Sequence, residues 1–207
     1  MKQIINSISI VMLLAALVLP AGMAVAQQQL GPAEVVQKVT SEVLEAVQDH
    51  RDSYDENPQA YFAAIDQVVS PYINFERMAF LVMDAKYYRA SSAGQREQFV
   101  ETFHDSLVNT YSKGLLSVDR AEFNILPVEV PAGSRTVTVK QELRAGANEF
   151  DLAYSMRRED DGRWLLVNVI IDGINLGNTF RNQFAQSAVK YDEDLDLVIA
   201  NWSADTE

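Results

Sequence analysis

Side chains that could serve as nucleophiles or metal ligands are scarce in this sequence. It contains no cysteine and two histidines, His50 and His104. No G-x-S-x-G turn presents a serine nucleophile, and no Gly-rich phosphate loop follows a strand. The two histidines lie too far apart in sequence to match a metal-ligand spacing, and both fall in segments with helical periodicity. We therefore expect neither a hydrolytic centre nor a metal site.

Carboxylates and tyrosines are the remaining candidates for chemistry. Asp151 or Asp172 could act as a general base if either lay in an apolar cavity. Beside Tyr111 or Tyr154, such a carboxylate could support an isomerase reaction. Most of the 29 acidic residues must nevertheless be solvated surface charge. We predict a protein without catalytic residues, and an isomerase-like cone-fold enzyme stays as an alternative.

Apolar periodicity and capping residues predict six helices to position these side chains. Ser92 and Gln95 have the spacing of a capping box, in which each side chain satisfies a backbone amide of the other's turn. Asn57 can cap the helix that follows it. The helices are expected over 32–50 and 58–69, from about Asn74, from Ser92 to Gly114, after Gly173, and from about Asp192.

Four strands are predicted between the fourth and fifth helices, separated by turn segments rich in Gly, Asn and Asp. The second and third alternate apolar and polar side chains, as a sheet with one buried face requires. The fourth is apolar on both faces and needs cover on both. The strands are expected over 123–130, 135–144, 149–157 and 163–171. This order predicts an α+β fold, an antiparallel four-stranded meander covered by N-terminal and C-terminal helices.

The N-terminal segment is typical of a secretory signal peptide. Lys2 supplies the positive charge, an apolar run follows over 4–19, and Pro20 precedes the small-residue motif Ala24-Val25-Ala26. Polar residues interrupt this run, which is also short for a membrane-spanning helix. We expect a signal peptide over 1–26 and one mature domain over 27–207, exported to the periplasm.

The mature chain is strongly acidic. Loss of Lys2 with the signal peptide leaves 16 basic residues against 29 acidic ones, a formal net charge of −13. This charge argues against nucleic acid as a partner and against direct docking on anionic lipid. Without cysteine, the core alone must hold the fold, and no lipidated N-terminal cysteine is available. We expect a monomer whose partners are proteins or neutralised ligands.

Three blocks in the first half of the chain resemble a known family. They are 71–79 (PYINFERMA), 88–91 (YRAS) and 95–99 (QREQF), followed later by 168–176 (NVIIDGINL) and 180–184 (FRNQF). In this order and spacing they resemble the periplasmic phospholipid-binding proteins of the Mla, or toluene-tolerance, transport system (the MlaC family). The resemblance covers nearly all of the mature chain. Asp84, Tyr88 and Asn168 depart from it, since the family usually has Gly, Trp and Asp there.

The resemblance implies a nuclear-transport-factor-like fold whose cavity holds phospholipid acyl chains, with the headgroup near the mouth. It implies phospholipid as cargo and no cofactor. The implied partners are an outer-membrane lipoprotein complex and an inner-membrane ABC transporter complex with its substrate-binding subunit. A carrier that shuttles lipid between them would maintain the lipid asymmetry of the outer membrane.

The residues expected to bind lipid combine apolar bulk with inward positions on the helices and strands, together with one arginine that could meet the lipid phosphate or hold Asp172. They are Met78, Phe99, Phe103, Tyr111, Val137, Val139, Leu152, Tyr154, Val169, Phe180, Arg181 and Phe184. The same apolar pattern also suits a filled core, because periodicity does not distinguish a filled interior from a hollow one. A structural periplasmic adaptor without ligand is therefore a further alternative.

Overall fold

The computed structural model describes residues 29–117 and 121–205, so the expected signal peptide over 1–26 lies outside the described residues. The helices are α1 (Pro32–Arg51), α2 (Pro58–Val69), the short 3-10 helix η1 (Ser70–Tyr72), α3 (Phe75–Ala90), α4 (Ala93–Leu115), α5 (Leu176–Lys190) and α6 (Leu195–Ala200). The strands are β1 (Ala121–Ile125), β2 (Thr136–Ala145), β3 (Asn148–Arg158), β4 (Trp164–Ile171) and β5 (Ile174–Asn175).

The strands form one antiparallel sheet in the order β1-β2-β3-β4-β5, which confirms the α+β class. The fifth strand corrects the predicted count of four. After β4, Asp172 and Gly173 both adopt positive φ, and Ile174 then pairs with Ile171. An Asp-Gly pair suits a two-residue hairpin turn, because such turns favour positive φ at both central residues. The chain therefore forms a small hairpin before α5 begins.

The first strand is shorter and begins earlier than the predicted range of 123–130. It spans Ala121–Ile125, and one more backbone bond joins the Leu126 amide to the Lys140 carbonyl at 3.0 Å. Pro127 follows and has no N–H to donate, so the ladder with β2 cannot continue through it. The segment from there to β2 is a loop.

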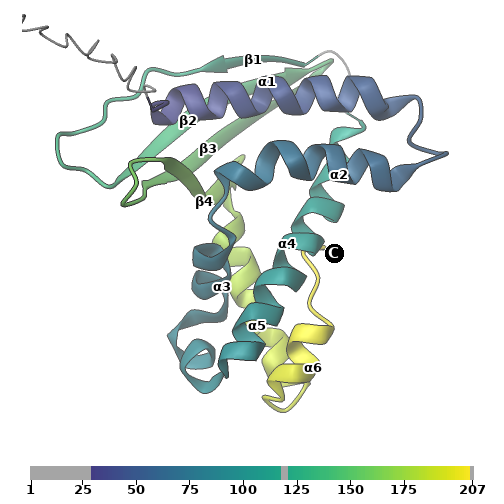
Figure 1. Cartoon of the computed structure of the whole chain (residues 1–207), viewed down its shortest axis with the longest axis vertical. Helices are drawn as coiled ribbons and strands as arrows, with labels where there is room; N and C mark the ends of the chain where they lie inside the picture. Colours follow the sequence, from purple (N-terminus) through teal and green to yellow (C-terminus); the bar gives the residue numbers. More distant parts are fainter. Residues whose placement is uncertain (1–28, 118–120, 206–207) are drawn as a thin grey trace, which may run out of the picture.

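The molecule has the outline of a T (Figure 1). The sheet, α1 and α2 form the crossbar, and α3, α4, α5 and α6 form the stem. The upper end of α4 contacts α2, while α5 and α3 contact β4, so these helices join the stem to the crossbar.

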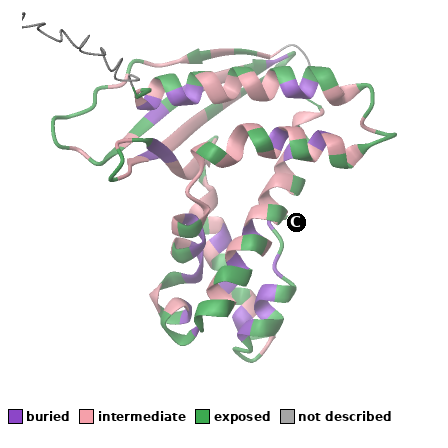
Figure 2. Cartoon of the chain, in the orientation of Figure 1, coloured by how far each residue is buried: buried purple, intermediate pink, exposed green. Residues whose placement is uncertain are grey.

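Among residues 29–117 and 121–205, most of the buried apolar side chains fall into three clusters rather than one (Figure 2). The stem cluster lies between α3, α4, α5 and α6. A second cluster joins the first half of α1 to the sheet, and a third joins the second half of α1 to α2. Half-buried apolar residues lie around all three, which is unlike a single continuous core.

The predicted cap at Asn57 and the predicted Ser92–Gln95 capping box are confirmed, and Asn74, expected only as a helix start, is also a cap. Asn57 accepts a hydrogen bond from the Ala60 amide at 3.2 Å, and Asn74 accepts one from the Arg77 amide at 2.9 Å. Ser92 and Gln95 form the reciprocal capping box at 3.2 and 2.9 Å. These side chains satisfy amides that have no partner inside their helices, which is why the sequence located the helix starts well.

Helix α3 contains a break that periodicity did not predict. Asp84 has φ 58° and ψ 166°, outside the helical region, so two helical pieces meet there. The Ala85 amide bonds to the Asp84 side chain at 2.5 Å. This conformation is one that glycine adopts readily and other residues do not. The family that the sequence resembles usually has glycine at this position, and this backbone conformation gives the physical reason. In this chain aspartate adopts the same kind of conformation.

Arg96 closes the connection from α3 to α4. Its Nη2 donates to the Ser91 carbonyl at 2.8 Å and its Nε to the Tyr88 carbonyl at 3.1 Å. The guanidinium also lies over the Tyr88 ring, 4.1 Å from its centroid. The blocks at 88–91 and 95–99 therefore belong to one helix-helix junction, in which Arg96 satisfies the last carbonyls of α3.

Candidate functional site

The sheet face beneath α1 brings together the strand residues expected to bind lipid. Val139, Tyr154 and Val169 are direct cross-strand partners on β2, β3 and β4. Leu152 lies two residues from Tyr154, and Val137 lies two residues from Val139. Because side chains alternate along a strand, all five point to the same side of the sheet.

Burial on this face changes along the strands. Val139 is 0% exposed, and it packs with Met156, Trp164 and two valines of α1. Leu152, Val169 and Ile171 are half-buried and belong to none of the three buried clusters. We call these three residues the half-buried sheet face. Its apolar side chains keep accessible surface on the side of the sheet that faces the helices.

A short polar chain crosses the boundary between the buried and half-buried parts. The Tyr154 hydroxyl donates to Gln141 Oε1 at 2.6 Å, and Gln141 Nε2 donates to Thr40 Oγ1 on α1 at 3.0 Å. Gln141 is 2% exposed, so both of its polar ends need such partners. Burial raises the pKa of Tyr154, which keeps the phenol protonated as a donor. These two hydrogen bonds join α1 to the sheet at one fixed position.

The predicted helix residues lie elsewhere, in the stem cluster. Phe99, Phe103, Phe180 and Phe184 are fully buried, and Met78 is nearly so. Their rings contact one another, with centroids 4.9 Å apart for Phe99 and Phe184 and 5.9 Å apart for Phe103 and Phe180. The structure therefore places these five side chains in a filled core. Their contact with lipid stays a prediction.

Tyr111 lies at the border of the stem cluster. It is half-buried on α4, and its ring centroid lies 6.4 Å from that of Phe180 in the stem cluster. Burial, and the nearby charge of Asp205, raise the pKa of Tyr111. It is thus a neutral, largely apolar side chain in the last turns of α4, next to Ser112, whose carbonyl accepts a hydrogen bond from Tyr61 on α2.

Arg181 on α5 reaches across to the break in α3. Its Nε donates to the Leu81 carbonyl at 2.9 Å. In an unbroken helix that carbonyl would accept from the Ala85 amide, but the Ala85 amide bonds to Asp84 instead. Arg181 thus caps the first piece of α3. This role was not found from the sequence, because the break at Asp84 was not expected.

The carboxylates proposed for acid-base chemistry lie at the surface. Asp151 and Asp172 are both exposed, and Asp172 Oδ1 accepts a hydrogen bond from the Asp151 amide at 2.8 Å. Asp172 therefore stabilises the turn between β4 and β5. Neither carboxylate is enclosed with Tyr111 or Tyr154, as the isomerase alternative requires.

A serine, a histidine and aspartates meet between α2 and α4, which sequence reasoning missed. His104 Nε2 lies 2.7 Å from Asp66 Oδ1 and 3.1 Å from Ser70 Oγ, and Nδ1 lies 2.8 Å from Asp105 Oδ1. Ser70 also donates to Asp66. Because Asp66 and Ser70 share the same ring nitrogen, the imidazole cannot accept a proton there from a serine nucleophile while it donates to Asp66. The cluster is a polar joint between two helices.

Two features are absent from residues 29–117 and 121–205. This part of the chain has no group of three or more His, Asp or Glu side chains placed to hold a metal ion. None of its helices combines the length and the apolar character needed to cross a bilayer.

Comparison with known proteins gives one consistent family. The MlaC protein family model matches residues 37–204. The toluene tolerance protein ttg2D of Pseudomonas putida is 31% identical over 175 residues, which cover 84% of this chain and 80% of that protein. The intermembrane phospholipid transport system binding protein MlaC of Haemophilus influenzae is 21% identical over 155 residues, covering 73% and 72%.

A solved structure shares the fold. It is the phospholipid-binding protein from Ralstonia solanacearum in complex with a phospholipid, with a TM-score of 0.71 and 24% sequence identity. The match covers 80% of this chain and 95% of that one. The arrangement of helices and sheet described above is therefore found in a protein already solved.

Proposed function

The chain belongs to the MlaC protein family, and we propose that it is a carrier that holds phospholipid and delivers it to other proteins. The names of the relatives support this, since one is a phospholipid transport binding protein and the solved neighbour was obtained with a phospholipid. The finer proposal is a periplasmic shuttle between an outer-membrane lipoprotein complex and an inner-membrane ABC transporter with its substrate-binding subunit. A carrier of this kind performs no catalysis.

The observation that carries the proposal is the half-buried sheet face. Leu152, Val169 and Ile171 keep accessible apolar surface, although Val139, in the same cross-strand row as Val169, is completely buried. Two acyl chains in water cost on the order of 20 kcal/mol, at roughly 0.8 kcal/mol per methylene. A carrier must therefore offer an apolar surface of its own. We assign the acyl chains to this face, with Tyr154 and Tyr111 beside them.

The phosphate end of the lipid is assigned to Arg181. Its Nε is held by the Leu81 carbonyl, while Nη1 and Nη2 have no hydrogen-bond partner among the described residues. These two nitrogens carry four N–H groups in one plane, a geometry that suits a phosphate. The bond to α3 would fix the guanidinium in place, so little side-chain entropy is lost when phosphate binds.

The test is the lipid content of matched variants. Val169→Trp would fill part of the half-buried sheet face, whereas Val189→Trp adds the same bulk on α5 at a residue that is 75% exposed. We expect mass spectrometry of organic extracts to find diacyl lipid in near-stoichiometric amount in wild type and Val189→Trp, and much less in Val169→Trp. Far-ultraviolet circular dichroism should be native in all three.

Two results would count against the proposal. Equal lipid content in the two tryptophan variants would remove the half-buried sheet face as the acyl site. Absence of lipid from wild type would favour the adaptor without ligand, or the isomerase-like enzyme if a small substrate is found instead.

A further inference from the structure

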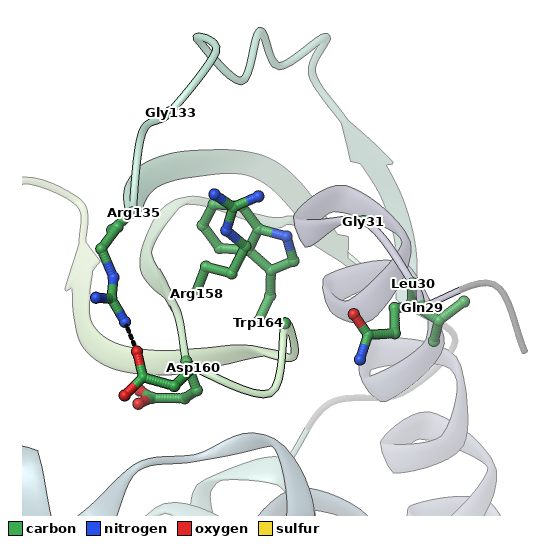
Figure 3. Close-up of a pocket in the computed structure, with 10 residues that line it drawn as sticks. Gln29, Leu30, Gly31, Gly133, Arg135, Arg158, Asp160 and Trp164 are labelled. Carbon is green, nitrogen blue, oxygen red and sulfur yellow. Dashed lines mark hydrogen bonds and ion pairs between the residues drawn. The ribbon is translucent and has the colours of Figure 1, made fainter. Parts of the chain in front are cut away.

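A second candidate site lies at the opposite end of the sheet from the half-buried sheet face. It is a pocket of about 600 Å³ between the start of α1, the loop before β2 and the turn from β3 to β4 (Figure 3). The residues around it are Gln29, Leu30, Gly31, Gly133, Arg135, Arg158, Glu159, Asp160, Gly162 and Trp164. Leu30 and Trp164 are the apolar side chains among them, so the pocket does not suit an acyl chain.

Arg158 and Trp164 form the centre of this pocket. They are cross-strand partners on β3 and β4, and the guanidinium lies over the indole, 5.8 Å from the ring centroid. Trp164 is 6% exposed, because its other contacts are with the buried cluster under α1. The tryptophan is therefore a rigid platform, and Figure 3 shows the Arg158 side chain extended across it.

The other charged groups of this pocket already have partners. Arg135 pairs with Asp160. Glu159 accepts a hydrogen bond from Asn74 Nδ2 at 3.0 Å and lies 4.0 Å from Arg157 Nε. In the part of the chain that the structure describes, Arg158 has no carboxylate partner. The Arg158 charge is therefore available to an anion from outside the chain.

The pocket is separate from the proposed acyl site. Arg158 pairs with Trp164 at one end of the two strands, and Leu152 pairs with Ile171 at the other. Six residues along a strand span about 20 Å. The buried cluster that includes Met156 fills the space beneath α1 between them. The headgroup of a lipid held at the half-buried sheet face would have to cross that cluster to reach Arg158.

We propose that this pocket binds the phosphate or carboxylate of a small polar organic anion, with Arg158 as its ligand and Trp164 as the platform beneath it. A guanidinium fixed on an aromatic ring offers paired N–H donors to either oxyanion. The volume falls in the range of pockets that hold small organic molecules rather than a bare inorganic ion. The anion comes either from solution or from a lipid headgroup at a bilayer surface.

The experiment uses the two tryptophan side chains as reporters. In NMR spectra of the isotope-labelled protein recovered after export, Trp164 reports on the pocket, and Trp202, buried in the stem, is the internal control. Glycerol phosphate is the probe and glycerol the neutral control. We expect glycerol phosphate to shift the Trp164 indole signal saturably, with Trp202 unchanged and no effect of glycerol.

Variants identify the ligand residue. Loss of paired charged hydrogen bonds should weaken binding about tenfold or more in Arg158→Ala, with partial recovery in Arg158→Lys. Arg163→Ala is the matched control, because Arg163 lies on the same turn but pairs with Asp161; its affinity should equal that of wild type. Co-purified diacyl lipid should be unchanged in all three variants, so failure here is distinguishable from failure of the proposed carrier function.

A final comparison distinguishes the two possible sources of the anion, solution and a lipid headgroup in a bilayer. A Trp164 response to phosphatidylglycerol vesicles at a lower phosphate concentration than to glycerol phosphate would assign the anion to a bilayer headgroup. A response to glycerol phosphate alone would assign it to solution. No response to either, an equal response in Arg158→Ala, or a response to an oligoglutamate peptide alone would overturn the proposal, and the last would identify a protein-docking site.

Discussion

Arg181 illustrates how one side chain is assigned by its contacts rather than by its motif. In the sequence it belongs to the block FRNQF, and both a phosphate contact and a bond to Asp172 fitted it. The structure places its Nε on the Leu81 carbonyl, while Asp172 bonds to the Asp151 amide. The guanidinium thus stabilises the broken helix, whatever its two free nitrogens bind.

We predict that Arg181→Ala lowers the free energy of unfolding by about 1–2 kcal/mol, because the partly buried Leu81 carbonyl loses its donor. The variant should also release lipid to acceptor vesicles faster than wild type, with partial rescue in Arg181→Lys. Urea unfolding and a lipid-retention assay measure the two effects. The exposed Arg89, replaced by alanine, is the control. Lost stability with normal retention would leave Arg181 as a helix cap alone.

Among the elements, α3 carries local strain. Asp84 holds a backbone conformation that costs most residues on the order of 1–3 kcal/mol. Glycine would relieve this strain but loses more chain entropy on folding, by roughly 0.5–1 kcal/mol. Asp84→Gly also loses the hydrogen bond to Ala85, but the relieved strain outweighs both losses, so we predict that it raises the free energy of unfolding by up to about 1 kcal/mol, as measured by chemical denaturation. Asp84→Ala keeps the strain and loses the hydrogen bond to Ala85, so it should be less stable than wild type; the reverse order would mean that the break is unstrained.

The joint between α2 and α4 depends on protonation of His104, whose side chain is 26% exposed. Burial alone would lower the pKa of His104, but the hydrogen bonds and charges of Asp105 and Asp66 outweigh it and raise this pKa above its ordinary value. The folded state thus binds this proton more tightly than the unfolded state. The resulting stability is fully present below about pH 6.5, the ordinary value, and is lost as pH rises through the raised pKa.

We predict that His104→Gln is less stable than wild type by about 1 kcal/mol at pH 6, and that this difference shrinks as the pH rises above the pKa of His104. Thermal unfolding at several pH values measures it. His50→Gln is the control, because His50 contacts the Ala46 carbonyl on its own helix and not a carboxylate. A stability difference that stays constant with pH would show that His104 contributes by packing.

At the scale of the whole molecule, the prediction of export concerns residues 1–26, which lie outside the described residues. The sequence predicts cleavage after Ala26, which would leave Gln27 as the first residue of a periplasmic protein. Intact-mass measurement on protein recovered from the periplasm should find the chain shorter by residues 1–26. A mass that includes these residues, or protein confined to the cytoplasm, would contradict this expectation.

The order of the elements and most of their starts could be predicted from the sequence. Asn57, Asn74 and the Ser92–Gln95 pair cap helices through contacts within three residues, so their roles are legible without tertiary structure. The alternation in 135–144 and 149–157 fixed two strands and their buried face for the same local reason. The short strand β5 was missed, although its Asp-Gly turn was a local signal.

Which apolar side chains are enclosed and which stay accessible could not be predicted, because it depends on tertiary packing. Phe99 and Val169 are equally apolar and equally well placed on their elements, yet one lies in a filled core and the other on the half-buried sheet face. Arg158 was likewise one arginine among many until its position on Trp164 was known. Periodicity reports the face on which a residue lies; packing between elements far apart in sequence decides what covers that face.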